Sequence, residues 1–162
     1  MEIIRIRAED TDRIAPLVAA FRMQLKAYKG IASQLNIESG KEEVLEFLQS
    51  GFPVFALEDK DSLVGYMVCR IDDMCVWVEH IFISEGYRRK GLASMLFQKA
   101  EEIAALMGEE TVYNYVHPNN EGMIRFLRSK GYTVLNLIEI RKPYANEKLT
   151  TTIQVDKETF DY

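Results

Sequence analysis

Apolar side chains recur along this chain with two periods, one typical of strands and one typical of helices. The β-prone stretches either alternate apolar and polar residues or are rich in β-branched and aromatic ones. Those expected to form strands are residues 2–7, 52–57, 63–71, 76–83, 111–116, 132–140 and 150–155. The helical stretches place apolar residues three and four apart. They are expected at residues 11–25, 41–50, 92–107 and 119–130.

Polar residues and glycines mark the turns and the helix ends between these stretches. Either Asp10 or Thr11 can cap the first helix, and a loop is expected over residues 30–40. Residues 58–62 are expected to form a charged hairpin turn. No repeat, low-complexity segment or linker interrupts the pattern, so we expect one domain over residues 1–162.

Composition is that of an ordinary soluble protein, with 48% hydrophobic and 28% charged residues among 162. No apolar run approaches the ~20 residues needed to span a membrane. The first residues lack the basic region and apolar core of a signal peptide, which favours a cytoplasmic protein. The net charge of −5 argues against nucleic acid as a partner and fits a cationic substrate better.

Cys69 and Cys75 are the only cysteines. If Asp72 and Asp73 form a two-residue hairpin turn, the two thiols fall on opposite faces of the sheet and are too badly aimed to bridge. Two buried thiols are therefore favoured over a disulfide or redox pair. With only two histidines besides, no zinc spacing appears, and we expect no metal site.

A basic glycine turn joins the strand over residues 76–83 to the helix that begins at Leu92. It reads Tyr-Arg-Arg-Lys-Gly-Leu-Ala over residues 87–93. Backbone N–H groups at a helix start are unpaired, the helix dipole favours an anion there, and Gly91 lets a ligand approach the backbone. These features predict a phosphate cradle. Its spacing is neither that of a P-loop nor that of a dinucleotide fingerprint with three glycines.

The spacing Arg88-x-x-Gly91-x-Ala93 resembles the acyl-coenzyme A signature of the GNAT superfamily of N-acetyltransferases, Gln/Arg-x-x-Gly-x-Gly/Ala. Two outlying matches support the resemblance. Residues 78–83 look like the family's fourth strand, and residues 120–132 look like its second conserved helix with the turn that follows. The close resemblance covers about residues 62–133.

The order of the expected elements matches the GNAT topology, whereas strand spacing alone gives only an α/β or α+β domain. The resemblance implies an α+β fold with a mixed central sheet of six to seven strands, flanked by about four helices. That sheet splays between strands four and five, and acetyl-coenzyme A, the implied co-substrate, places its pantetheine arm in the split. The residues implied in coenzyme binding are Ile81, Phe82, Ile83, Arg88, Arg89, Lys90, Gly91, Leu92, Ala93, Ser94 and Asn120.

Acetyl transfer to an amine needs a base, because the amine arrives as an ammonium. Glu79, a carboxylate in an otherwise apolar strand, is the candidate, at a position where polyamine acetyltransferases of the family carry a substrate-facing glutamate. The alternative is a structural carboxylate, paired with an arginine or merely exposed. The N–H groups of residues 81–83 would address the acetyl carbonyl and the pantetheine amides if the strand carries a bulge. Strict alternation places His80 on the opposite face, as a satisfied, partly buried histidine rather than a catalytic one.

Three further residues are candidates for substrate contact: Trp77, Tyr115 and His117. Trp77 is alternatively a core residue, and Asn120 can cap its own helix while also contacting the coenzyme arm. In many relatives a tyrosine protonates the departing thiolate, and here Leu127 takes its place. The acid is therefore missing unless Tyr115, Tyr144 or water substitutes.

We expect an acetyl-coenzyme A-dependent N-acetyltransferase that acts on a primary amine by direct attack in a ternary complex, without a cysteine-linked intermediate. The sequence does not choose among polyamine-like, amino acid, antibiotic and protein acceptors. The alternative function is a catalytically weak acyl-coenzyme A-binding module that senses or regulates. The sequence does not decide whether residues 144–162 pair with the same domain or with a second subunit. In the second arrangement the protein would be a homodimer.

Overall fold

The computed structural model describes residues 1–162 and divides them into two compact units, residues 1–115 and residues 116–162. The first unit is built around a five-stranded sheet in which the strands lie in chain order. All neighbouring strands are antiparallel except the last pair, which is parallel. The strands are β1 (Glu2–Arg5), β2 (Val54–Asp59), β3 (Ser62–Asp72), β4 (Cys75–Ile83) and β5 (Tyr113–Asn114).

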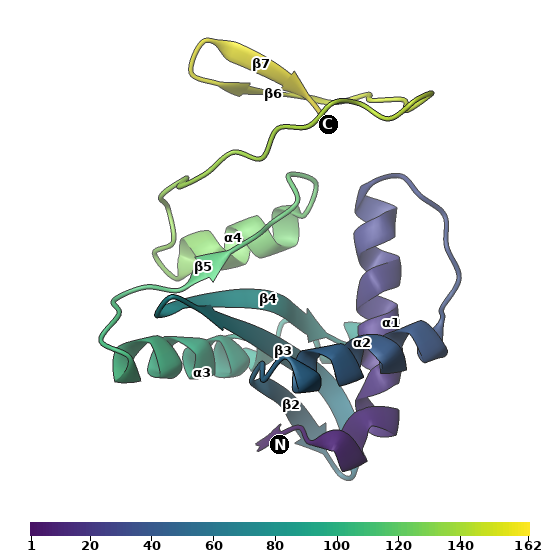
Figure 1. Ribbon diagram of the computed structural model, residues 1–162, viewed down its shortest axis with the longest axis vertical. Helices are drawn as coiled ribbons and strands as arrows, with labels where there is room; N and C mark the ends of the chain where they lie inside the picture. Colours follow the sequence, from purple (N-terminus) through teal and green to yellow (C-terminus); the bar gives the residue numbers. More distant parts are fainter. The chain divides into compact units, whose positions relative to one another are not determined.

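Helices cover this sheet on both faces (Figure 1). They are α1 (Thr11–Tyr28), α2 (Ile37–Gln49) and α3 (Leu92–Leu106). The central strand β3 is buried at six successive positions, Val64–Cys69, which requires cover on both sides because neighbouring side chains point to opposite faces. One face packs against α1 and α2 in a cluster that includes Ile14, Val18, Val44, Tyr66 and Val68. The other face is covered by α3, which packs against β2, β3 and β4.

The starts of α1 and α2 differ from the prediction. Neither Asp10 nor Thr11 caps α1 with its side chain, because both close the short 3-10 turn before it. The Asp10 carboxylate accepts from the Arg7 backbone N–H at 3.1 Å, and the Thr11 hydroxyl donates to the Ala8 carbonyl at 2.7 Å. The helix α2 begins inside the predicted loop, because Asn36 accepts a hydrogen bond from the backbone N–H of Ser39 and caps the helix there.

The hairpin between β3 and β4 turns at Asp73 and Met74, one residue later than predicted. Both residues have positive φ, as a two-residue hairpin turn favours. Cys69 faces Val78, Cys75 faces Asp72, and both thiols are free, the first buried and the second half-buried.

The second unit, residues 116–162, contains one helix and a hairpin. They are α4 (Glu121–Ser129), β6 (Thr152–Val155) and β7 (Glu158–Asp161). The strand predicted over residues 132–140 is absent, and apolar side chains such as Leu135 and Ile140 are exposed there. A β-prone stretch is a strand only when it pairs with another one, and the two strands of this unit, β6 and β7, pair with each other.

The predicted α+β class and mixed sheet are confirmed, with seven strands in total and four α-helices. The central sheet has five strands rather than six to seven, since the last two strands form a separate sheet. None of the helices combines the length and the apolar character that crossing a membrane requires.

Candidate active site

A β-bulge interrupts β4 at Glu79. Val68 of β3 faces His80, the next residue Cys69 faces Val78, and Glu79 is left without a partner. The bulge on which the expected backbone contacts depend is therefore present. It also overturns the expectation that Glu79 and His80 lie on opposite faces, because an extra residue shifts the alternation. Both side chains lie on the face of Val68, where His80 meets Tyr66 and Glu79 meets Arg70.

Beyond the bulge, β4 has an open edge. The parallel strand β5 pairs only with Trp77 and Val78, before the bulge. The Ser84 N–H donates to the Val64 carbonyl on the β3 side, at 2.9 Å. Because backbone groups alternate along a ladder, Phe82 also bonds toward β3, whereas Ile81 and Ile83 direct theirs to the open edge. Of the three predicted backbone donors, Ile81 and Ile83 are thus available to a ligand, and Phe82 is not.

The predicted phosphate cradle is the turn that leads into the first residues of α3. Gly91 is the residue before the helix and has φ 78°, the left-handed region in which glycine carries no penalty. No side chain caps this helix, so the N–H groups of Leu92, Ala93 and Ser94 in its first turn have no capping partner. A Cβ built on Gly91 would meet no atom within 4 Å, so the space above the turn is open. These features fit the binding of a phosphate group.

The cationic side chains of this turn have different surroundings. Arg88 donates through Nε to the Ile83 carbonyl at 2.8 Å and through a terminal nitrogen to Gln24 of α1 at 3.0 Å. Its guanidinium also lies 5.6 Å from the centre of the Phe82 ring. Arg88 therefore fastens the turn to β4 and α1. Lys90 donates to the Gly86 carbonyl at 3.0 Å.

Arg89 has φ 62°, an uncommon conformation for a residue with a Cβ. It directly precedes Lys90 and Gly91 in the turn. Together with Lys90 it supplies positive charge at a helix start that already favours anions.

Glu79, the candidate base, is held by an ion pair. Its Oε1 accepts from Nε of Arg70 at 2.5 Å, and Arg70 also pairs with Asp72 at 2.9 Å. The hydrogen bond to Glu79 raises the pKa of Arg70, which keeps the guanidinium charged. The Glu79 side chain is 26% exposed and stays accessible to solvent. This pairing of Glu79 with Arg70 matches the alternative role considered for Glu79 in the sequence analysis, that of a structural carboxylate paired with an arginine.

Aromatic rings surround this ion pair. Trp77 is half-buried and stacks on Tyr115 with ring centres 4.8 Å apart, and Tyr113 lies at the same distance. The Arg70 guanidinium lies 5.1 Å from the Trp77 ring centre, so Trp77 binds a cation of its own chain. Tyr115 is 60% exposed, which leaves its hydroxyl free of the core. These residues form a surface beside Glu79.

His80 is the centre of a buried polar network that the sequence did not predict. Its Nδ1 lies 3.0 Å from the Tyr66 hydroxyl, and its Nε2 lies 3.6 Å from Oε1 of Glu43 in α2. Glu43 in turn pairs with Arg22 of α1 through two hydrogen bonds. The sequence offered only a weak indication of this network. Arg22 and Glu43 are charged residues in two separate helices, and nothing in their spacing along the chain predicts that they meet.

Burial, together with the smaller effect of the nearby Arg22 charge, lowers the pKa of His80 to about 3. Glu43 would favour the imidazolium, but its charge is already compensated by Arg22. Burial also raises the pKa of Tyr66, which keeps its hydroxyl protonated. Because a carboxylate only accepts, the neutral imidazole directs its N–H to Glu43 and accepts from Tyr66. His80 is thus a hydrogen-bonded histidine, as expected, and it is fully buried rather than partly buried.

In the second unit, Asn120 caps α4 as predicted, its Oδ1 accepting from the Met123 N–H at 3.1 Å. The Asn119 N–H donates to Nδ1 of His117 at 3.2 Å, so His117 shapes the turn before that helix. Leu127 is buried within α4 and offers no hydroxyl.

The thiols do not contribute a nucleophile. Burial raises the pKa of Cys69 to about 12, and a thiol that stays protonated at neutral pH is inert. Cys75 is half-buried at the start of β4, next to the hairpin turn. No observation therefore supports a cysteine-linked intermediate.

An open strand edge that can bind amides, followed by an uncapped helix start that can bind phosphate, is the arrangement expected of a site for an acyl-coenzyme A. The sequence model of the acetyltransferase (GNAT) family matches residues 20–132, and the chain belongs to this family. By that membership it is an acetyl-coenzyme A-dependent N-acetyltransferase.

Solved structures of acetyltransferases share the fold. The aminoglycoside N-acetyltransferase AAC(6')-Iy, in complex with a bisubstrate analogue, is similar at 15% identity and a TM-score of 0.67, over 89% of this chain and 98% of that chain. A ribosomal-protein-alanine N-acetyltransferase from Brucella melitensis is similar at 15% identity and 0.68, over 88% and 99%. The PaiA N-acetyltransferase from Thermoplasma acidophilum, in complex with coenzyme A, is similar at 22% identity and 0.65, over 79% and 87%.

Proposed function

We propose that this chain transfers an acetyl group from acetyl-coenzyme A to a primary amine by direct attack in a ternary complex. The observation that carries the proposal is the continuity between the open edge of β4 and the start of α3. Arg88 joins the two by its bond to the Ile83 carbonyl at the end of β4. The pantetheine amides would lie along the edge at Ile81 and Ile83, and the pyrophosphate would lie on the N–H groups that follow Gly91.

Positioning and electrostatics supply most of the acceleration in this mechanism. Holding the amine and the thioester together is worth effective molarities of ~10⁵ M or more. The outward N–H of Ile81, next to the bulge, is the donor we assign to the oxyanion of the tetrahedral intermediate. Glu79 takes the proton of the incoming ammonium, directly or through water, while Arg70 holds the carboxylate in place.

The departing thiolate leaves without an acid from α4, since Leu127 has no proton to donate. A thiolate with a pKa near ~8.5 is a tolerable leaving group at neutral pH. Water completes the protonation. This step separates the proposed mechanism from one in which a tyrosine of α4 is the acid.

The experiment that tests the coenzyme site is a matched pair of glycine substitutions in α3. Gly91 and Gly108 flank the two ends of the helix, both have positive φ, and a Cβ at either would meet no atom within 4 Å. Aspartate at either position therefore carries a similar backbone strain of ~1–3 kcal/mol. Gly91→Asp is expected to abolish coenzyme A binding in calorimetry, because it adds a negative charge where the pyrophosphate would lie. Gly108→Asp is expected to retain it, and wild-type affinity in Gly91→Asp would refute the site.

A second candidate function is a catalytically weak acyl-coenzyme A-binding module. Two observations favour it: the ion pair that occupies Glu79 and the absence of a hydroxyl at Leu127. Turnover of acetyl-coenzyme A with a panel of primary amines distinguishes the two. Coenzyme binding with no turnover of any amine would support the binding module.

A further inference from the structure

The extra residue of β4 has three possible places in the strand, and backbone pairing alone does not select among them. Val68 of β3 pairs with His80 and the next residue, Cys69, pairs with Val78, which leaves Glu79 as the extra residue. The pairs further along the ladder on both sides would be the same if Val78 or His80 were the extra residue instead. Side-chain contacts must therefore decide where the bulge forms.

Two contacts with β3 exclude the alternatives. If the extra residue lay one place later, the His80 side chain would turn to the opposite face of the sheet, and if it lay one place earlier, the Glu79 side chain would turn. Tyr66 keeps His80 on the observed face, with its hydroxyl 3.0 Å from Nδ1, and Arg70 keeps Glu79 there at 2.5 Å. Tyr66 and Arg70 lie two residues before and after Val68, on the same face of β3. Each of the two contacts therefore blocks one displacement of the bulge.

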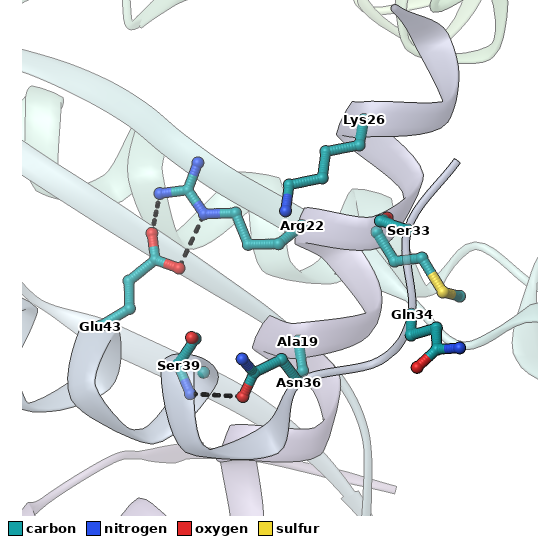
Figure 2. A pocket seen from close by; sticks show the side chains of 10 residues that line it. Ala19, Arg22, Lys26, Ser33, Gln34, Asn36, Ser39 and Glu43 are labelled. Carbon is teal, nitrogen blue, oxygen red and sulfur yellow. Dashed lines mark hydrogen bonds and ion pairs between the residues drawn. The ribbon is translucent and has the colours of Figure 1, made fainter. Parts of the chain in front are cut away.

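The His80 imidazole is also enclosed from the side of α1 and α2. Its ring centre lies 4.4 Å from that of Phe21 and 5.0 Å from that of Phe47. Its Nε2 lies 3.6 Å from Oε1 of Glu43. Glu43 accepts two hydrogen bonds from Arg22, one of them 2.7 Å long, in the wall of a pocket between the two helices (Figure 2). The side chain of His80 is thus held on this face by both helices as well as by β3.

The position of the bulge matters for Ile81, the donor that we assign to the oxyanion. Ile81 follows His80 and pairs with Met67 in the regular ladder, where its N–H is directed to the open edge of β4. If the extra residue lay one place later, Ile81 would adjoin it, and a bulge disrupts the ladder locally and bends the strand. The N–H would then no longer be aimed at a thioester bound along the edge.

We propose that His80 is a positioning residue for acetyl transfer, because its bond with Tyr66 fixes the extra residue of β4 at Glu79 and so aims the Ile81 N–H. The inference rests on the proposed function and adds a residue to its mechanism. The imidazole is buried and bonded on the side of the helices, so it acts through the backbone of β4 and transfers no proton.

Two substitutions of His80 separate its two polar contacts. In His80→Asn the side-chain oxygen takes the place of Nδ1 and accepts from Tyr66, whereas in His80→Gln the amide takes the place of Nε2, near Glu43. We expect the kcat of His80→Asn to stay within about threefold of the wild type. His80→Gln and Tyr66→Phe should each lower kcat at least tenfold, because the oxyanion donor is misdirected. The Kd for coenzyme A, measured by calorimetry, should change less than threefold in all three variants, since the start of α3 is untouched.

A matched control separates positioning from a loss of stability. Ile14→Val shortens a fully buried side chain of the same core cluster as Tyr66 and does not contact the bulge. It should unfold at a lower urea concentration than the wild type and keep its kcat. All variants are assayed at a temperature at which each is fully folded. A loss of kcat in Ile14→Val equal to that in Tyr66→Phe would overturn the proposal.

The position of the bulge is read directly from nuclear Overhauser effects between backbone protons of β3 and β4 in the isotope-labelled full chain. The wild type and His80→Asn should show Val68 opposite residue 80, whereas His80→Gln and Tyr66→Phe should also show Val68 opposite Glu79. An unchanged register in the last two variants, or equal losses of kcat in His80→Asn and His80→Gln, would refute the role of His80. If the wild type turned over no amine, the proposed function would fail, and the register would still show whether His80 holds the bulge.

Discussion

Acid should destabilise this protein through one buried side chain, His80. The imidazole is 6% exposed, and its pKa in the folded chain is about 3 against an ordinary value of 6.5. Below pH 6.5 the unfolded chain takes up a proton at this residue and the folded chain does not. Stability is therefore lost as the pH falls from 6.5 toward 3, since the unfolded state binds more protons throughout that interval.

The magnitude follows from the separation of the two pKa values, at ~1.4 kcal/mol for each pKa unit. The full effect is ~5 kcal/mol near pH 3, and the loss between pH 7 and pH 4.5 is about 2.5 kcal/mol. The groups that face the imidazole are Glu43, Arg22 and Tyr66. Glu43 opposes the effect, and its bonds to Arg22 limit that opposition.

The assay is urea denaturation followed by the fluorescence of Trp77, the only tryptophan, which lies in the same unit as His80. His80→Asn keeps an acceptor for the Tyr66 hydroxyl and cannot titrate, so its stability should fall about 2.5 kcal/mol less than that of the wild type between pH 7 and pH 4.5. Tyr66→Phe serves as the control, because it weakens the fold but keeps the acid-dependent loss. Equal losses in the wild type and His80→Asn would refute a buried neutral imidazole.

Three substitutions test other parts of the argument. Glu79→Gln should lower turnover ~10²-fold or more and remove the acidic limb of the pH–rate profile, and an unchanged profile would make Glu79 a structural partner of Arg70. Leu127→Tyr should change turnover by less than about tenfold, because positioning and oxyanion stabilisation carry most of the barrier reduction; a larger gain would show that the missing acid limits the wild type. Gly40→Ala should lower the free energy of unfolding by ~1–3 kcal/mol, since its Cβ would lie 2.5 Å from the Ala15 carbonyl oxygen. Gly86→Ala, with nothing within 4 Å, should be nearly neutral in the same thermal or urea unfolding measurement.

The sequence by itself determined the local structure of the stretch in which we propose the coenzyme site. A strand rich in β-branched residues, a glycine turn and an amphipathic helix are local patterns, and each depends on neighbours within a few positions. Gly91 has a positive φ, a backbone conformation that other residues adopt only at an energetic cost, so its role can be predicted from the sequence alone. The cap at Asn120 was predicted for the same reason, because its partner lies three residues away.

Tertiary structure decided which side chains meet. The bulge at Glu79 exists only in the pairing of β4 with β3, and it reverses the face assigned by alternation. The partners of Glu79 and of His80 come from other strands and helices, so no spacing along the chain could name them. Residues 132–140 show the same limit, since their β-propensity predicted a strand that pairs with no other segment in the structure. Local propensity depends on adjacent residues, whereas contacts between distant segments depend on how the whole sheet pairs.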